Sequence, residues 1–331
     1  MAQQPTAEIP RERIESLIRY ATLAPSSHNT QPWQFTVSGN RIRVHLDESR
    51  WLRIADPDQR ELHISIGCCL ENLMVAAAHF GHQPQLIYFP EEGNTWLAAE
   101  ILLQPESPAP VPADAARFDA IPHRRTSHRL FHPRPLPKTM QQRIQESCTE
   151  EGIQLFLTED AEIRSRVEQL AVEADALQFS DPAFRHELGE WIGRGAFGTP
   201  WLLAKLGQLA VTYLDMGVSM GKQDVDRIES APVLGLITSS GDDRTSQIKA
   251  GRVFEAIYLA ATIEGVSLQP MSQLCEIASI RGQLARLTPQ PGLYPQQPFR
   301  LGFADPEPGQ TPRRPLDEVL CMPLPMAQTN R

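Results

Sequence analysis

The sequence predicts an α+β protein in which two related halves share one chain, and three observations support this class. Stretches with helical periodicity alternate with short stretches of strand periodicity along the chain. The proline-rich stretch 105–112 (PESPAPVP) favours extended backbone and predicts a boundary between two parts. An apolar helix before that boundary is repeated after it, which indicates gene duplication.

The first predicted elements are a helix and a hairpin joined by a short turn. Apolar residues recur at helical spacing up to Ala24, and Pro25 stops the helix. Apolar residues then alternate over 35–46 around a turn at 38–40, as in a hairpin. The connecting residues 24–33 (APSSHNTQPW) hold hydroxyls, an amide and two prolines. They form either an ordinary loop or a rigid, donor-rich turn that grips a flat polar ligand.

The repeated helix is predicted over 63–81 and again over 247–265. Identical residues recur between the two segments at a constant separation of 184 residues. Each segment ends at a glycine, as expected for a left-handed residue that caps a helix. Two alanine-rich core helices can resemble each other by chance, but the unbroken register favours duplication. The matching pairs are Ile64 and Ile248, Gly67 and Gly251, Glu71 and Glu255, Ala76 and Ala260, Ala77 and Ala261, and Gly81 and Gly265.

The other elements are predicted from the same periodicities. Residues 181–220 are expected to be irregular, because glycines interrupt their apolar stretches. The tail over 313–320 is expected to be extended. Further predicted elements are strands at 85–89, 96–103, 231–238 and 298–303, and helices at 138–150 and 161–178.

Composition and charge argue against several classes of function. The 331 residues carry a formal net charge of −9, which disfavours a surface for nucleic acid or an anionic membrane. We find no apolar run of the ~20 residues that span a bilayer and no export signal at the N-terminus. The five cysteines include no C-x-x-C spacing, which indicates a reducing, cytoplasmic setting without a metal site.

The turn APSSHNTQPW resembles the flavin-contacting signature of the nitroreductase family, in which a P-S-S-x-N turn lies against FMN. Together with the repeated helix, it is similar to the Acg-like branch, whose chains fuse two nitroreductase-like halves. The resemblance implies a nitroreductase-like α/β/α sandwich in which residues 1–108 and 109–331 are the halves of a pseudo-dimer. The FMN contacts that it implies in this turn are Pro25, Ser26, Ser27 and Asn29.

The segment after the proline-rich stretch carries a second part of the resemblance. Arg124-Arg125-Thr126 is similar to the family's R-R-S/T element, which binds the phosphate and ribityl chain of FMN. Guanidinium groups match the geometry of phosphate, although a basic cluster by itself is also typical of a solvated surface. His128 stands where the family often has lysine or arginine near flavin N1 and O2, which implies a pH-dependent positive charge there.

Two stretches near the C-terminus complete the implied cofactor site. The segment 313–319 resembles the family's phosphate-binding R-x-P-L-x-E-V stretch, with Arg314 as the first candidate and Arg313 as the next. Otherwise it is an ordinary basic tail. The segment 265–273 resembles a G-x-x-x-x-P loop that places a backbone N–H against flavin N5, or else it is a buried turn. The implied contacts in this loop are Pro270, Met271 and Ser272.

Two further motifs are interpreted as accidental matches. G-x-S-x-G at 217–221 would need a later histidine, as in α/β-hydrolases, but the last histidine is His186. G-x-G-x-x-G at 193–198 follows a helix-like segment, whereas the dinucleotide fingerprint follows a strand. The glycines of both motifs fit a lid over the flavin, which we expect within 181–222.

The resemblance implies an enzyme, an FMN-dependent oxidoreductase of nitroreductase type. Hydride would pass in a ping-pong scheme from NAD(P)H through FMN to an electron-poor acceptor, such as a nitroaromatic or a quinone. No side chain need act as an acid or a base, so no catalytic residue is assigned. The alternative is a protein that sequesters FMN under a closed lid, with little or no turnover.

The number of sites and the partners follow from the same resemblance. We expect one flavin per chain, because only the first half carries the P-S-S-x-N turn and only the second carries the arginine-rich segment. The implied partners are small molecules, NAD(P)H and the acceptor, with no nucleic acid and no membrane. The chain is expected to act as a monomer with pseudo-dimeric architecture or as a homodimer.

Overall fold

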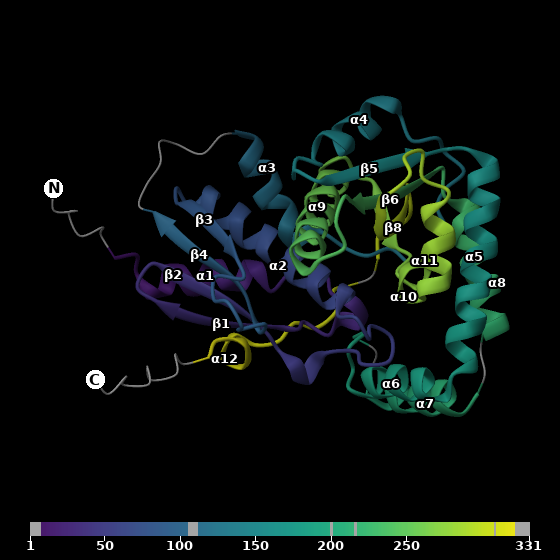
Figure 1. The fold of residues 1–331 in the computed structure, drawn as a ribbon, viewed down its shortest axis with the longest axis horizontal. Coiled ribbons are helices and arrows are strands. Elements are labelled where there is room, and N and C mark those ends of the chain that lie inside the picture. The colour runs from purple at the N-terminus through teal and green to yellow at the C-terminus, as the bar shows by residue number, and fades with distance from the viewer. Residues whose placement is uncertain (1–7, 105–111, 199–200, 215–216, 308, 322–331) are drawn as a thin grey trace.

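The chain folds into two four-stranded antiparallel sheets with helices packed around them (Figure 1). The first sheet has the strand order β1-β2-β4-β3 and the second has the order β5-β6-β8-β7. Because the same order occurs twice, the structure confirms an α+β fold with two related halves. The computed structural model describes residues 8–104, 112–198, 201–214, 217–307 and 309–321.

The elements follow one another in the same order in both halves, apart from an insertion between β5 and β6 and the helices α10 and α11 between β7 and β8. In the first half they are α1 Arg11–Ala21, β1 Trp33–Ser38, β2 Arg41–Leu46, α2 Arg60–His79, β3 Gln83–Tyr88 and β4 Leu97–Gln104. In the rest of the chain they are α3 Pro112–Ala120, α4 Lys138–Glu146, β5 Ile153–Thr158, α5 Ala161–Ser180, α6 Pro182–Gly193, α7 Trp201–Tyr213, α8 Gly217–Ser230, β6 Val233–Ser239, α9 Arg244–Ile263, β7 Ser267–Pro270, α10 Gln273–Glu276, α11 Ala278–Ala285, β8 Tyr294–Gly302 and α12 Leu316–Val319.

The helices α2 and α9 lie between the two sheets and cross at a pair of glycines (Figure 1). A Cβ atom on Gly67 would collide with the carbonyl oxygen of Ile248, and one on Gly251 would collide with that of Ile64. Gly67 corresponds to Gly251, and Ile64 corresponds to Ile248, each pair being 184 positions apart. Each glycine therefore contacts the counterpart of the residue that the other glycine contacts. The two helix backbones therefore touch about a local twofold axis, as in a dimer of two copies.

Both central helices end in the same way. Gly81 and Gly265 follow them with positive φ angles of 82° and 66°. The amide of the next residue bonds back into the last turn, His82 to Ala77 at 3.0 Å in α2 and its counterpart at 2.8 Å in α9. This is the Schellman arrangement, and it confirms the left-handed caps that the two glycines predict.

The two halves differ most in one hairpin. Gly39 and Asn40 alone connect β1 to β2, whereas residues 159–232 connect β5 to β6. This insertion carries the helices α5, α6, α7 and α8, which lie along one side and the lower edge of the molecule in Figure 1. Three of these helices, α6, α7 and the start of α8, occupy the range 181–222 in which the lid is expected.

The prediction that residues 181–220 are irregular is wrong, because the described residues of this range are mostly helical. Two of the glycines that suggested breaks lie where α6 packs against α7. A Cβ atom on Gly189 would collide with the side chain of Thr212, and one on Gly193 would collide with that of Gln208. Gly189 and Gly193 thus allow two helices to approach closely, whereas Gly195 and Gly198, with positive φ angles, lie in the connection after α6.

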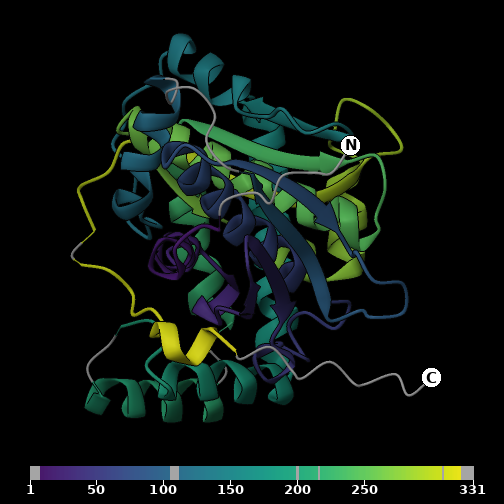
Figure 2. The same ribbon diagram turned by 90° about the vertical axis from the view of Figure 1, so that its left-hand side faces the viewer.

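The C-terminal segment of the second half joins the sheet of the first half. After β8 the chain returns to the first half, where Leu320 forms a bridge with Phe35 of β1. Figure 2 shows this C-terminal segment, in yellow, running along one side of the molecule to α12. Within the second half, Thr126 of the segment after α3 forms a bridge with Leu268 of β7. The tail predicted to be extended over 313–320 is confirmed only in part, because Leu316–Val319 form the short helix α12.

Two strands of the second sheet are absent from the sequence predictions. The six residues of β5 lie between the predicted helices 138–150 and 161–178, where no element was predicted. The strand β7 ends at Pro270 and lies at the edge of its sheet, where the missing N–H of proline is tolerated. Its four residues were predicted as part of a loop.

One helix has the length and composition of a membrane span. It is α2, whose mean hydropathy is 1.2, but 83% of that apolar window is buried inside the protein. We interpret α2 as the core helix of the first half. No other helix in the part of the chain that the structure describes passes the same test.

The boundary between the halves cannot be traced in the structure. Residues 105–111 of the proline-rich stretch lie outside the described residues. The first sheet ends at Gln104, and α3 begins at Pro112. The boundary between residues 108 and 109 stays a prediction.

The helix crossing gives the first test. Gly67→Ala should lower the free energy of unfolding by about 3 kcal/mol, because the added methyl must push two helix backbones apart. Gly282→Ala in α11 is the matched control. A Cβ atom there meets nothing within 4 Å, so that variant should be unchanged or up to ~1 kcal/mol more stable. Urea unfolding of both variants measures the difference, and equal midpoints would contradict the close crossing.

Candidate functional site

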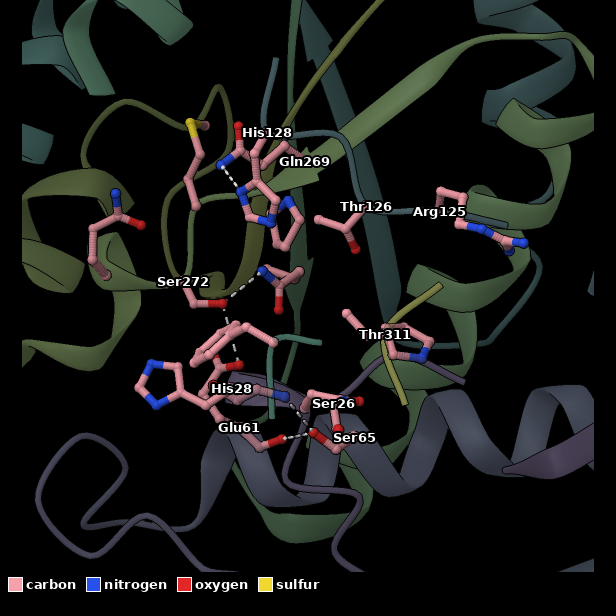
Figure 3. Close-up of a pocket in the computed structure, with 18 of the residues that line it drawn as sticks. Ser26, His28, Glu61, Ser65, Arg125, Thr126, His128, Gln269, Ser272 and Thr311 are labelled. Atoms are coloured by element: carbon pink, nitrogen blue, oxygen red, sulfur yellow. Dashed lines mark hydrogen bonds between the residues drawn. The ribbon is translucent and has the colours of Figure 1, made fainter. Parts of the chain in front are cut away.

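A cavity of about 590 Å³ lies where the two halves and the insertion meet. Its wall combines the turn after α1, the segment after α3, the loop between β7 and α10, the C-terminal segment, and the helices α2, α5 and α8. Figure 3 shows Thr126 and His128 on one side and Ser26 and Ser65 on the opposite side. The predicted residues that line the cavity are Pro25, Ser26, Ser27, Asn29, Arg124, Arg125, Thr126, His128, Pro270, Met271, Ser272 and Arg313.

The turn after α1 has an unusual backbone. His28, Asn29 and Gln31 have positive φ angles of 47°, 52° and 51°, which non-glycine residues seldom adopt. Hydrogen bonds fix this conformation. In one of them, the backbone N–H of Gln31 donates to Ser26 Oγ at 2.9 Å. Backbone strain of this kind clusters at ligand sites, where the surrounding structure holds it in place.

The side chain of Asn29 joins three separate parts of the chain. Its Nδ2 donates to the carbonyl of Ala196 in the insertion at 2.7 Å and to that of Pro312 in the C-terminal segment at 3.0 Å. Its Oδ1 accepts from Arg313 at 3.2 Å. Asn29 therefore holds the turn against the insertion and the C-terminal segment.

Two arginines that are far apart in the sequence, Arg124 and Arg313, lie together at one end of the cavity. Arg124 and Arg313 both donate to the carbonyl of Leu23, at 3.3 Å and 3.1 Å. Arg124 is buried, and its Nε and Nη1 have no hydrogen-bond partner, nor has Nε of Arg313. Burial and the neighbouring Arg124 lower the pKa of Arg313 to about 10, so Arg313 stays charged at neutral pH. Buried, unsatisfied N–H donors on adjacent cations indicate an anion site.

The nearest buried acid does not neutralise this cluster. Glu255 of α9 lies 3.5 Å from Nε of Arg124, too far for a hydrogen bond. Burial raises the pKa of Glu255 to about 7, and Arg124 opposes that rise. One partly ionised carboxyl therefore faces the guanidinium groups of Arg124, Arg125 and Arg313. The net charge at this end of the cavity is positive.

The pH-dependent charge expected at His128 stays a prediction. Burial and the neighbouring Arg227 lower the pKa of His128, while Glu307 opposes this, so its charge would appear at a lower pH than in a free imidazole. Its Nδ1 lies 3.2 Å from the amide nitrogen of Gln269, and Figure 3 shows the two side chains together. Fixed positive charge on this side of the cavity comes from Arg227 and Arg300, which the sequence analysis did not select.

The loop between β7 and α10 is held by contacts of both backbone and side chain. The N–H of Met271 donates to the carbonyl of Pro298 at 2.9 Å, so it is not available to a ligand. Ser272 Oγ donates to Glu61 at 3.3 Å and accepts from Gln297 at 3.3 Å (Figure 3). The side chain of Ser272 thus links the second half to α2 of the first half.

The order of the two C-terminal arginines is the reverse of the prediction. Arg313 lines the cavity, whereas Arg314 is absent from its lining. Arg314 points instead to the first sheet, where its Nη1 lies 3.1 Å from Asp47 and donates to the carbonyls of Gln31 and Trp33. Because Asp47 is buried and needs a cation, Arg314 serves as a structural ion-pair partner.

Sequence reasoning missed two groups of cavity residues. Glu61, Ser65 and Cys68 line the cavity from α2. Their spacing of four and three residues places them on one face of a helix, and this signal was present in the sequence. Phe179, Phe184, Asp175 and Asp224 line the cavity from the insertion. No local pattern indicates these, since the fold alone brings them to the cavity.

The two motifs set aside as accidental have ordinary structural places. Gly193 ends the helix α6, so the G-x-G-x-x-G segment follows a helix, as interpreted. Residues 217–221 begin the helix α8. Among the described residues, no group of three or more His, Cys, Asp or Glu side chains is arranged to hold a metal ion.

Comparisons with known proteins agree with this geometry. The model of the Nitroreductase family matches residues 4–51, which include the strained turn. Rv3131 of Mycobacterium tuberculosis, provisionally named as an NAD(P)H nitroreductase, is 30% identical over 323 residues, which cover 94% of this chain and 92% of that protein.

The chain belongs to the nitroreductase family. It is therefore a member of a family of oxidoreductases. Its similarity to the Acg-like proteins extends along almost the whole length. The protein Acg of Mycobacterium tuberculosis, which carries the same provisional name, is 27% identical over 329 residues, covering 95% of this chain and 97% of that one.

Solved nitroreductases overlap with part of the chain. The FMN-dependent nitroreductase NfnB of Mycobacterium smegmatis, solved with NADPH, is 16% identical and covers 66% of this chain and 100% of its own, with a TM-score of 0.43. A nitroreductase of Bacteroides fragilis with bound FMN is 15% identical and covers 59% of this chain and 93% of its own, with a TM-score of 0.39.

The corrected place of Arg314 gives a second test. Arg314→Ala should lower the free energy of unfolding by about 3 kcal/mol, because it removes the nearer cation of the buried carboxylate of Asp47 and leaves only Arg50, at 3.9 Å. The control is Arg53→Ala, which removes an ion pair of similar length, with Glu48, that is more than half exposed. That loss should stay below ~1 kcal/mol. Equal losses in chemical unfolding would show that Arg314 has no special structural role.

Proposed function

We propose that this protein binds FMN and acts as an NAD(P)H-dependent oxidoreductase on an electron-poor acceptor, such as a nitroaromatic or a quinone. The observation that carries the proposal is the convergence of Arg124 and Arg313, whose unsatisfied N–H donors face one end of the cavity. A phosphate group has the charge and the acceptor geometry that these donors need. The names of Rv3131 and Acg support NAD(P)H as the electron donor.

The residues of the cavity fit FMN along its length. Arg124, Arg125 and Arg313 would hold the phosphate, while the turn 25–29 and the loop 270–272 border the space for the ring from different halves. Thr126 and His128 line the wall beside the arginines. When bound, FMN supplies two-electron chemistry between donor and acceptor. The protein contributes orientation, a fixed positive field and protection from water.

We propose that only one such site exists in each chain. The position on α9 that corresponds to Cys68 of α2 is occupied by Arg252. The guanidinium of Arg252 lies 3.0 Å from Glu71 and also pairs with Glu150. Its Nη1 bonds to the hydroxyl of Tyr88 at 3.0 Å. A network of charged side chains thus lies where a second cofactor would need a cavity.

The remaining proposals concern organisation and location. We propose residues 1–108 and 109–331 as the two halves, with a lid within 181–222. One chain supplies both walls of the cavity, so a monomer is sufficient for activity, with or without further pairing. All five cysteines are free thiols, which supports a reducing cytoplasm.

FMN storage is a second candidate function, because the insertion is attached to the first half at several points. Asn29 bonds to Ala196, and the carboxylate of Glu187 on α6 accepts the N–H groups of Ile54 at 3.1 Å and Ala55 at 2.9 Å. If these bonds keep the lid closed, the bound ring would be protected from substrates.

Anaerobic reduction separates the two functions. The purified protein should be yellow, and NADPH or NADH should bleach its visible band within seconds, because the flavin of a reductase accepts hydride. A flavin that stays oxidised for minutes with excess of either donor, yet is bleached by dithionite, would contradict the reductase and support storage. A colourless protein that gains no flavin from added FMN would contradict both.

The arginine pair gives a separate test of cofactor binding. Arg124→Met and Arg313→Met should each raise the Kd for FMN by about 10- to 100-fold, because each removes charge-assisted bonds to the phosphate. Arg286→Met is the matched control, since Arg286 is exposed and lies outside the cavity. Titration of flavin-free protein, followed by flavin fluorescence, measures the affinities. An unchanged Kd in both cavity variants would place the phosphate elsewhere.

A further inference from the structure

The insertion gives the cavity a second, partly apolar end. Phe179 and Phe184 line it together with Leu188 of α6 and Met220 of α8. Asp175 of α5 lies in the same wall. These residues come from α5, α6 and α8, whereas the anion site comes from the turn and the two arginine segments. The two ends of the cavity therefore have different chemistry.

Asp175 is the polar side chain in this wall that lacks a partner. It is only 4% exposed, it lines the cavity, and its Oδ2 makes no hydrogen bond to any described residue. Asp224 on the facing helix α8 differs, because its Oδ1 accepts from Arg227 and its Oδ2 accepts from Gln273, each at 2.7 Å. An unsatisfied buried carboxyl is costly unless a ligand supplies the missing donor.

The cations around Asp175 are already engaged. Arg227 pairs with Asp224 and also donates to the carbonyl of His128 at 3.1 Å. Arg300 donates to Gln269 at 2.7 Å and to the carbonyl of Arg129 at 2.6 Å. Oδ2 of Asp175 is therefore an unpartnered acceptor that this end of the cavity offers to a ligand.

We infer that the wall formed by α5 and α8 is a subsite for an aromatic electron acceptor that carries a cationic amine, which Asp175 binds while Phe179 and Phe184 contact the ring. The inference rests on the proposed function for the identity of the ligand as an acceptor. A cation gains from both Asp175 and Asp224, whereas an anionic acceptor meets these two acids, and the arginines Arg227 and Arg300 are already engaged. The subsite thus selects acceptors by charge.

Titration of Asp175 gives the preference a pH dependence. Burial and the neighbouring Asp224 raise its pKa to about 7, and Arg227 opposes the rise. The neutral His128 and the paired Glu276 also line this end of the cavity. A cationic ligand binds the ionised carboxylate better, so its affinity should rise between about pH 6 and pH 8. A neutral ligand of the same shape should show no such rise.

Three probes of similar shape test the inference with the protein as purified. They are 4-nitrobenzylamine, 4-nitrobenzyl alcohol and 4-nitrobenzoate, with Kd measured by calorimetry at pH 8. The amine should bind about tenfold tighter than the alcohol, and the benzoate should bind weakest. Asp175→Asn should abolish the preference for the amine. Asp226→Asn, an exposed aspartate of α8 outside the cavity, should keep it.

Two results would overturn the inference. One is equal affinity of the unsubstituted protein for the amine and the alcohol at pH 8, a comparison that needs no variant to fold. The other is a preference for the amine that survives in Asp175→Asn. Binding is measured without turnover, so the outcomes stay separate from the reductase test. A protein that prefers the amine but is not bleached by NAD(P)H contradicts only the proposed function.

Discussion

The structure depends on the contact between the backbones of α2 and α9. Helices that carry side chains at their crossing stay about 8–10 Å apart, but Gly67 and Gly251 remove that spacer at equivalent places. The two halves are thereby close enough to share a cavity, with the turn of the first half on one wall and the segment 124–128 of the second half on another. A short contact in the core thus determines where the site forms.

Fusion of the halves has allowed them to diverge while the crossing stayed symmetric. In the first half the hairpin connection is two residues long, whereas the second half carries four described helices in the corresponding place. Of these helices, α5, α6 and α8 border the cavity, and the strained turn forms another part of its wall. At the opposite position, Arg252 and its acidic partners occupy the space. This ion-pair network supports our proposal of a single composite site in each chain.

The sequence was sufficient where a feature depends on local residues. The turn, the repeated helix and its glycine caps could each be predicted, because their signals lie within a few residues. It was insufficient where distant contacts decide. Whether Arg313 or Arg314 faces the cavity depends on Asp47, which lies more than 250 positions away. Gly189 and Gly193 suggested irregular structure because their packing partners on another helix could not be identified, and Asp175 gave no local signal at all.

The central claim is that one fused chain builds one composite cofactor site. Titration of the flavin-free protein with FMN, at protein concentrations well above Kd, measures the number of sites directly. Saturation at one FMN per chain is the result that this account predicts, because Arg252 occupies the equivalent place on α9. Saturation at two FMN per chain would show that the second site persists, and saturation at one FMN per two chains would show that the site needs another copy.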